Sequence, residues 1–119
     1  MIKRYLFILC KAAHSGAYAQ EMLDIILTTA AFDQAVSILL LDDSVFQLKK
    51  HQYPEKYDMK DIVAIFSALE IYDIKDIYIE RESLYERGLS VDDLCLPVQI
   101  LARKAISELM QQFDVIFSG

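Results

Sequence analysis

The chain has 119 residues, a formal net charge of −6 and a hydrophobic fraction of 55%. This length fits one domain with one core, and the acidic balance excludes a basic groove that would grip nucleic acid directly. The hydrophobic fraction exceeds the ~45–50% usual for a domain of this kind, which predicts spare apolar surface for burial against partner chains.

The first third of the chain alternates short apolar runs with a helical pattern. Residues 5–10 form a continuous apolar run, typical of a strand buried on both faces. Residues 11–16 predict a loop, and residues 17–31 repeat apolar side chains every three or four positions, as a helix with one buried face does. A second apolar run, residues 35–41, predicts the next strand, which Asp42-Asp43-Ser44 ends.

The middle of the chain continues the alternation. Residues 48–57 are polar, contain Pro54 and predict a loop. Asp58 is suited to cap a helix whose buried face ends at Leu69. One more unit of loop and helix therefore separates the second predicted strand from the third.

The stretch from Asp76 to Leu89 predicts a buried strand that runs straight into a short helix. The strand covers Asp76 to Ile79 or Glu80. The segment Ser83–Glu86 matches a capping box, and Gly88 stands where the glycine after a helix belongs. Chemistry in α/β proteins collects at such strand ends, yet this corner contains no cysteine.

The last third predicts a short strand, a helix and a final strand. Residues 94–98 form the strand, and Pro97 in it favours a sheet edge. The helix covers 101–113 and the final strand 114–117. The whole alternation predicts an α/β fold, with residues 1–119 as one domain: a mostly parallel five-stranded sheet with helices on both faces.

Cys10 is the candidate nucleophile that the residues themselves suggest. It ends the first predicted strand just before a helix start, where the helix N-terminus and Lys11 would lower its pKa and favour the thiolate. The competing interpretation is a small buried core residue, which also fits Cys95. Asp42-Asp43 is a candidate acid–base pair, for which a solvated turn is the alternative.

Other classes of site have little support in the sequence. A metal site needs several ligands at fixed spacing, and neither His14 nor His51 lies in such a cluster. The three glycines form no nucleotide-binding motif, so no cofactor is expected, although the loop 11–16 could hold an anion. No apolar run reaches the ~18–20 residues of a membrane span, and the run at the start of the chain, residues 5–10, is shorter than the ~7–15 of a signal sequence, which predicts a cytoplasmic chain.

Several segments in order resemble the DsrE/DsrF-like sulfur-relay family, and within it the TusC-like subunits. They span nearly the whole chain. The segments are the start KRYLFILCKAAHSG, Asp43–Leu48, Leu69 with Tyr72-Asp-Ile74, Ser83–Leu89, and Phe113-Asp-Val-Ile116.

The resemblance places a glutamate where the sulfur-carrying relatives have their cysteine. In those relatives the cysteine lies on the strand-to-helix corner, eight residues before the glycine of the turn. Counting back eight from Gly88 gives Glu80. A carboxylate cannot form or hold a persulfide, so the resemblance implies that this chain is not the catalytic member.

The implied role is that of a supporting subunit in a heterohexamer. Its partners would be a TusB-like chain and a cysteine-bearing TusD-like chain, two copies of each, in a relay that ends in 2-thiolation of the tRNA wobble uridine. The two expected interface segments contribute Asp43, Val45, Phe46, Leu48, Glu80, Ser83, Leu84 and Arg87. Two alternatives stay open: a DsrF-like subunit of sulfur oxidation, and a sulfur carrier in its own right that uses Cys10.

Overall fold

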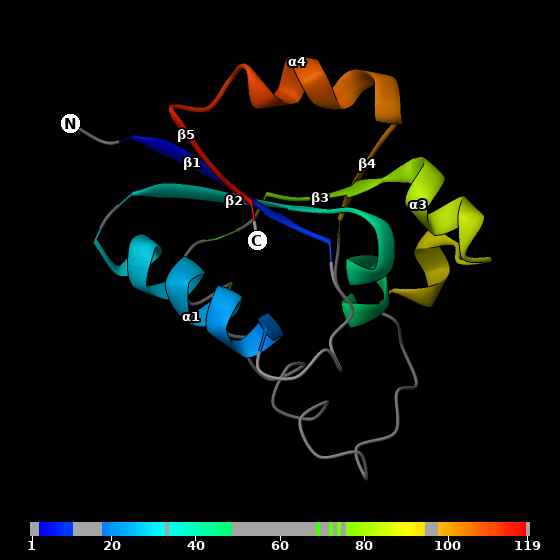
Figure 1. Ribbon diagram of the computed structural model, residues 1–119, viewed down its shortest axis with the longest axis horizontal. Helices are drawn as coiled ribbons and strands as arrows, with labels where there is room; N and C mark the ends of the chain where they lie inside the picture. Colours follow the sequence, from blue (N-terminus) through cyan, green and yellow to red (C-terminus); the bar gives the residue numbers. More distant parts are fainter. Residues whose placement is uncertain are drawn as a thin grey trace, which may run out of the picture.

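A computed structural model describes residues 3–10, 18–32, 34–48, 69, 72, 74, 76–94 and 98–118, apart from the side chains of 18–20, 23 and 46–48. Within these residues strands alternate with helices (Figure 1). In chain order the elements are β1 (Arg4–Leu9), α1 (Tyr18–Ala31), β2 (Ala35–Leu40), the 3-10 helix η1 (Asp42–Leu48), β3 (Ile77–Glu80), α3 (Arg81–Glu86), the 3-10 turn η2 (Val91–Asp93), β4 (Gln99–Leu101), the 3-10 turn η3 (Arg103–Ala105), α4 (Ile106–Met110) and β5 (Val115–Ser118).

The strands form one five-stranded sheet in the order β4-β3-β2-β1-β5. All four neighbouring pairs run parallel, which confirms the predicted α/β sheet. The longest ladder joins β1 to β2 from Arg4 opposite Ala35 to Leu9 opposite Leu40. Because parallel strands end at the same edge, the residues that follow β1, β2, β3 and β4 are gathered at one side of the molecule.

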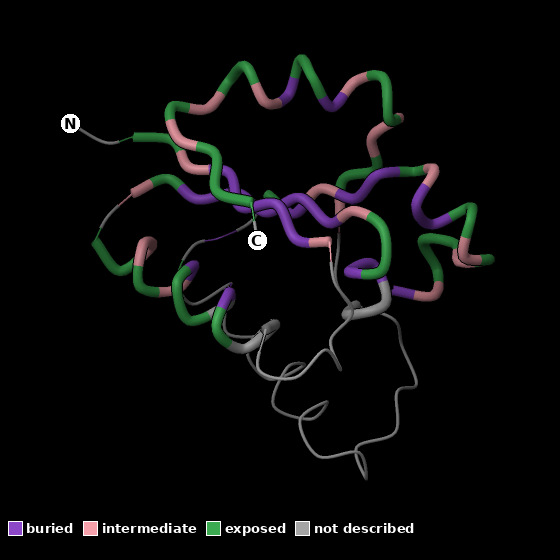
Figure 2. Tube along the Cα trace, in the orientation of Figure 1, coloured by how far each residue is buried: buried purple, intermediate pink, exposed green. Residues whose placement is uncertain are grey.

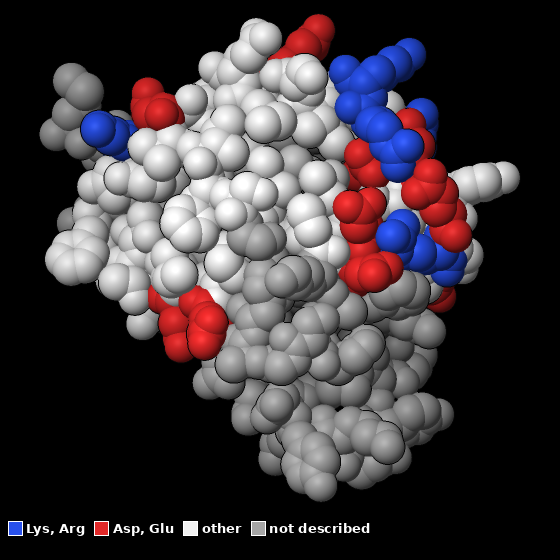
Figure 3. Space-filling view, viewed as in Figure 1, with Lys and Arg blue, Asp and Glu red and all other residues white. Residues whose placement is uncertain are grey.

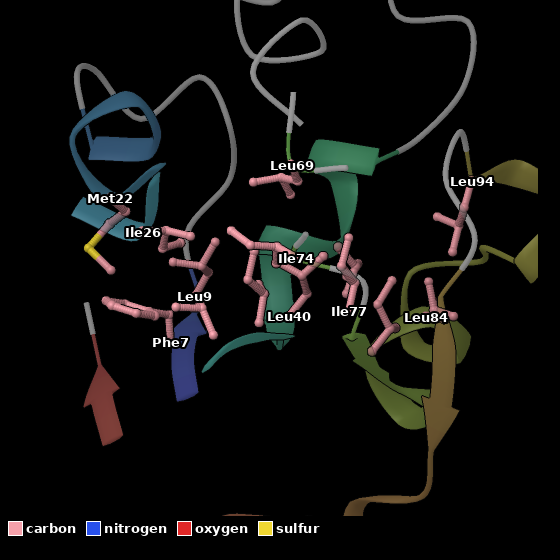
Figure 4. Packing of buried hydrophobic residues seen from close by; sticks show 14 residues of the cluster. Phe7, Leu9, Met22, Ile26, Leu40, Leu69, Ile74, Ile77, Leu84 and Leu94 are labelled. Atoms are coloured by element: carbon pink, nitrogen blue, oxygen red, sulfur yellow. The ribbon is translucent and has the colours of Figure 1, made fainter. Parts of the chain in front are cut away.

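The sheet separates two apolar layers. On one face Phe7, Leu9 and Leu40 pack with Met22 and Ile26 of α1 (Figure 4). On the other face the core contains Leu6, Ile8, Leu39 and Ile106, the last from α4. Figure 1 shows α1 and α4 on opposite sides of the strands, and Figure 2 shows buried residues concentrated in the strands between them. Helices therefore cover both faces, as the alternation of apolar runs predicted.

The prediction for residues 94–113 was wrong in its boundaries. The edge strand is Gln99–Leu101 rather than 94–98, and the helical part shrinks to η3 and α4. Leu101 pairs with Glu80 of β3, so its backbone is committed to the sheet. At the other end, Arg4 of β1 donates from Nη1 to the carbonyl oxygen of Gln112 at 2.8 Å, which satisfies a carbonyl at the end of the helical segment.

The capping box predicted at Ser83–Glu86 is also wrong. The helix α3 begins at Arg81, immediately after β3, so Ser83 lies inside it. Its C-terminal end is as predicted: Gly88 has φ +69°, and the amides of Gly88 and Leu89 donate to the carbonyls of Tyr85 and Leu84 in a Schellman motif. A capping box does occur one turn later, between Ser90 and Asp93.

Several predicted elements fall outside the described residues. These are the loops 11–16 and 48–57, apart from Leu48, and nearly all of the helix 58–69, of which Leu69 is described and buried. In the part of the chain that the structure describes, no helix has the length and apolarity needed to cross a membrane.

Candidate functional site

The carboxyl edge of the sheet joins three chain segments through backbone contacts. The amide of Leu41 donates to the carbonyl of Leu9 at 2.9 Å, and the amide of Ser44 donates to the carbonyl of Cys10 at 3.1 Å. The buried Ser44 hydroxyl donates to the carbonyl of Leu9 at 2.6 Å or of Leu41 at 2.7 Å. The start of η1 is thus fastened to the end of β1, beside Cys10.

Glu80 ends β3 and is buried, with 5% of its surface exposed. Arg103, which follows β4, binds its carboxylate with two nitrogens. Arg103 Nε lies 3.1 Å from Glu80 Oε2, and Arg103 Nη2 lies 3.1 Å from Oε1. This two-point geometry matches the planar guanidinium to the planar carboxylate, which is the strongest common form of ion pair.

Ser83 supplies a third donor to the same carboxylate. Its hydroxyl donates to Glu80 Oε1 at 2.5 Å and accepts the backbone amide of Asp42 at 2.8 Å. Ser83 is fully buried, and Asp42 has φ 52°, a left-handed conformation that aspartate tolerates better than most residues. The serine hydroxyl therefore links the end of β3 to the loop after β2.

These contacts decide the protonation state of Glu80. Burial alone would raise the pKa of its carboxyl group. The hydrogen bonds from Arg103 and Ser83, together with the charges of Arg103 and Arg87, outweigh burial and lower the pKa below its ordinary value. Glu80 is accordingly a stable carboxylate. The pKa of Arg103 is raised in turn by its hydrogen bond to Glu80.

Arg87 makes a second link between α3 and the loop after β2. Its Nε lies 3.0 Å from Asp43 Oδ1, and its Nη2 lies 4.0 Å from Asp42 Oδ1. Both aspartates are exposed, as the alternative of a solvated turn at Asp42-Asp43 requires. They serve as surface partners of one arginine.

The two segments predicted as interface are adjacent in space. The links from Asp42 to Ser83 and from Asp43 to Arg87 join η1 to α3. Within this pair of segments, Val45, Ser83, Leu84 and Glu80 are buried in the chain's own fold. Asp43 is exposed and Arg87 is half-buried, whereas the side chains of Phe46 and Leu48 lie outside the described set.

Cys10 lies in an environment opposite to the predicted one. Burial raises the pKa of its thiol, and the negative charges of Asp42 and Glu80 raise it further. The expectation of a lowered pKa is therefore wrong. His14, His51, Cys95 and the loop 11–16 lie outside the described residues.

Arg103 is the functional residue that sequence reasoning missed. It stood inside a predicted helix, 23 positions from Glu80, and no local pattern pairs the two. Its Nη2 also lies 3.4 Å from Glu86 Oε2, and its backbone amide donates to Glu82 Oε1 at 2.8 Å. Figure 3 shows the resulting concentration of acidic and basic side chains at the end of the molecule that carries α3 in Figure 1.

Comparison with known proteins identifies the family of the chain. The model of the DsrE/DsrF-like family matches residues 3–118. The chain belongs to the DsrE/DsrF-like family. It is 38% identical to a protein named Protein TusC homolog from Pseudomonas aeruginosa over 99% of both chains. It is 34% identical to the intracellular sulfur oxidation protein DsrF of Allochromatium vinosum, over 99% of this chain and 97% of that protein.

Solved structures show the same fold in more distant chains. The ychN protein of Escherichia coli superimposes with a TM-score of 0.77 at 16% identity, over 100% of both chains. The protein MTH1491 of Methanobacterium thermoautotrophicum gives a TM-score of 0.71 at 13% identity, over 98% of this chain and 99% of that chain. The DsrE/DsrF-like chain thus has the five-stranded α/β architecture of these proteins.

Proposed function

We propose that this chain is a non-catalytic subunit of a sulfur-transfer complex in the cytoplasm. The complex would be a heterohexamer with TusB-like and TusD-like partners, two copies of each chain, in the relay that leads to 2-thiolation of the tRNA wobble uridine. Support comes from the family match and from relatives named TusC homolog in Pseudomonas aeruginosa and Aliivibrio fischeri, the second 34% identical over 92% of this chain.

The observation that carries the proposal is the state of Glu80. The resemblance assigns the sulfur-carrying cysteine to this position, and the side chain here is a buried carboxylate held by Arg103 and Ser83. A sulfur carrier needs a thiolate that accepts a sulfane sulfur and releases it again. Glu80 can do neither, so the working cysteine belongs on a partner chain.

Cys10 does not supply the missing chemistry. Its pKa is raised by burial and by two neighbouring carboxylates, which reduces the thiolate fraction at neutral pH. If Cys10 nevertheless carried sulfur, the isolated chain would accept labelled sulfur from an upstream donor and Cys10→Ser would abolish tRNA thiolation. We expect no stable labelling of the isolated chain and normal thiolation in the variant.

The subunit role requires surface that partners can cover. Tyr85, with 84% of its surface exposed, is the most exposed large apolar side chain in the described part of the chain. Tyr85 lies on α3 and lines a surface pocket with Arg81, Glu82 and Glu86, and tyrosine and arginine are enriched among the anchors of interfaces. We propose that α3 and η1 form one partner surface, with Asp43, Arg87 and Tyr85 in contact and Val45, Glu80, Ser83 and Leu84 supporting it from below.

Co-expression with TusB-like and TusD-like chains tests the proposal. Native mass spectrometry of the purified complex should give two copies of each chain. Tyr85→Ser should weaken the assembly at least about tenfold, the loss typical of an interface anchor. Phe32→Ser, an equally drastic change before β2 at the opposite edge of the sheet, is the matched control and should leave the assembly intact. A chain that stays monomeric beside both partners would refute the subunit role.

The similarity to DsrF supports one alternative pathway, sulfur oxidation. The 34% identity to the Allochromatium vinosum protein is close to the values for the TusC homologs, so the same subunit role could serve sulfur oxidation. A deletion strain separates the two. Loss of 2-thiouridine from tRNA, measured by mass spectrometry of nucleosides, supports the relay; unchanged tRNA together with impaired sulfur oxidation supports the alternative.

A further inference from the structure

Three hydrogen-bond donors converge on the carboxylate of Glu80. Two belong to the Arg103 guanidinium, at 3.1 Å each, and the third is the Ser83 hydroxyl at 2.5 Å. The carboxylate is nearly removed from water, so these donors replace its hydration shell. Such a set of donors is what a buried anion needs.

The donors are held in place by groups other than Glu80. A serine hydroxyl has a single proton, and the backbone amide of Asp42 occupies its acceptor side at 2.8 Å. The proton of Ser83 is thereby directed toward the carboxylate. The backbone of Arg103 is fixed by Glu82 at 2.8 Å, and its guanidinium also contacts Glu86 at 3.4 Å. Both donors therefore have partners besides Glu80.

We propose that this corner is a preorganised site for one small anion, which the chain fills with its own Glu80 carboxylate. The chemical class that fits is a monoanion, either a carboxylate or a thiolate, and removal of the Glu80 side chain opens the site to a ligand from solution. Two donors from a planar guanidinium and one from a hydroxyl are matched to an anion that carries a single charge.

Both positive and negative side chains surround the site, and the positive charge of Arg103 lies closest to the Glu80 carboxylate. Arg103 faces Glu80 from the segment after β4, and Arg87 adds positive charge from α3. Glu82 and Glu86 on α3 share Arg103 but do not enclose the carboxylate, and Asp42 on η1 is paired with Arg87. Among the described residues, Cys10, after β1, is a further titratable neighbour, and the charge of Glu80 contributes to its raised pKa.

The inference deepens the proposed function and rests on it for its biological meaning. If the working cysteine of a sulfur-relay chain stands at position 80, the same donors would hold its thiolate. In this chain the ionised Glu80 carboxylate places the same single negative charge at this position. Anion binding at this site, however, is a property of the isolated chain and can be tested without any partner.

Rescue of Glu80→Ala by acetate is the first test. The variant loses the carboxylate and keeps the donors, and acetate should raise its Tm by about 3 °C or more relative to chloride at equal ionic strength. Glu80→Gln fills the same space without charge and should show no acetate effect, and neither should Glu80→Ala with Arg103→Met. Equal Tm values in acetate and chloride for folded Glu80→Ala would overturn the proposal.

A cysteine at position 80 provides the second test, which does not require an open cavity. In a chain with Cys10→Ser and Cys95→Ser, the thiol of Glu80→Cys should have a pKa about one unit or more below the ordinary ~8.5, measured from thiolate absorbance against pH. Adding Arg103→Met should remove that decrease. A thiol with an ordinary or raised pKa would refute the thiolate part of the proposal and leave the carboxylate part to the acetate test, whereas failure of the chain to assemble with partners would refute only the subunit role.

Discussion

Glu80 and Cys10 end neighbouring regions of the same sheet edge, yet their surroundings act on them in opposite ways. Glu80 is the more buried of the two, and three donors keep it charged. Cys10 is only half-buried, and its pKa is raised by burial and by the carboxylates of Asp42 and Glu80. Burial alone therefore does not decide which group ionises; the local hydrogen-bond donors do.

The same corner cannot stabilise the ionised forms of both Glu80 and Cys10. The arginines that stabilise a negative charge face Glu80, and the negative charge so stabilised then opposes ionisation of Cys10. A carboxylate at position 80 thus makes the thiol at position 10 a poorer nucleophile.

Arg103→Met should have the largest effect. It leaves the buried Glu80 carboxylate with the Ser83 hydroxyl but without the guanidinium, and a buried charge that loses its partner is destabilising, here less than in a fully buried pair because Arg103 is itself 53% exposed. We expect Tm to fall by roughly 5–10 °C in thermal unfolding followed by circular dichroism. Lys104→Met, an exposed change at the next position, is the control and should shift Tm by less than about 2 °C. Equal shifts for the two variants would mean that the ion pair contributes little.

Glu80→Gln should show how the carboxylate contributes across pH. Because the pKa of Glu80 is lowered in the folded chain, its contribution is complete above the ordinary value of 4.5 and is lost as pH falls through the folded value. The difference in Tm between wild type and Glu80→Gln should therefore be largest near neutral pH and shrink below pH about 4.5.

The control for this titration is Glu108→Gln, which removes one exposed carboxylate from α4. Its difference from wild type should be smaller than that of Glu80→Gln at neutral pH, because exposed carboxylates contribute little to stability. A Glu80→Gln difference that grows on acidification would contradict the sign of the Glu80 pKa shift.

The fold was accessible from the sequence because its signals are local. Apolar runs such as Tyr5–Cys10 and Ala35–Leu41 predicted β1 and β2 within one residue at each end, and Gly88 marked the end of α3. The boundaries near Leu101 were missed because pairing with β3, a contact between distant residues, overrides the helical pattern that begins there.

Only part of the site could be predicted from the sequence, because its contacts join residues far apart in the chain. Glu80 could be located by counting from Gly88, but its ion pair to Arg103 joins residues 23 positions apart, one at the end of β3 and the other in η3. Ser83 was assigned to a capping box because Ser-x-x-Glu is a valid local pattern, and its actual partners, Glu80 and the Asp42 amide, are set by how η1 packs on α3. Sequence patterns find strand ends, whereas packing decides what those ends bind.

Asp42→Asn should give the smallest effect, and it tests whether the charge of Asp42 lowers the reactivity of the Cys10 thiol. Asparagine tolerates the left-handed φ of 52° at this position, so the loop should keep its shape while one charge near Cys10 is lost. In a Cys95→Ser background, alkylation of Cys10 by iodoacetamide at pH 8 should become about two to four times faster as its thiolate fraction rises. Asp43→Asn removes the same charge one residue further on, at a carboxylate bound to Arg87, and should leave the rate nearly unchanged. Equal acceleration by both variants would mean that opening of the loop, rather than the charge of Asp42, controls the alkylation rate of Cys10. The explanation that neighbouring carboxylates suppress ionisation of the Cys10 thiol would then be wrong.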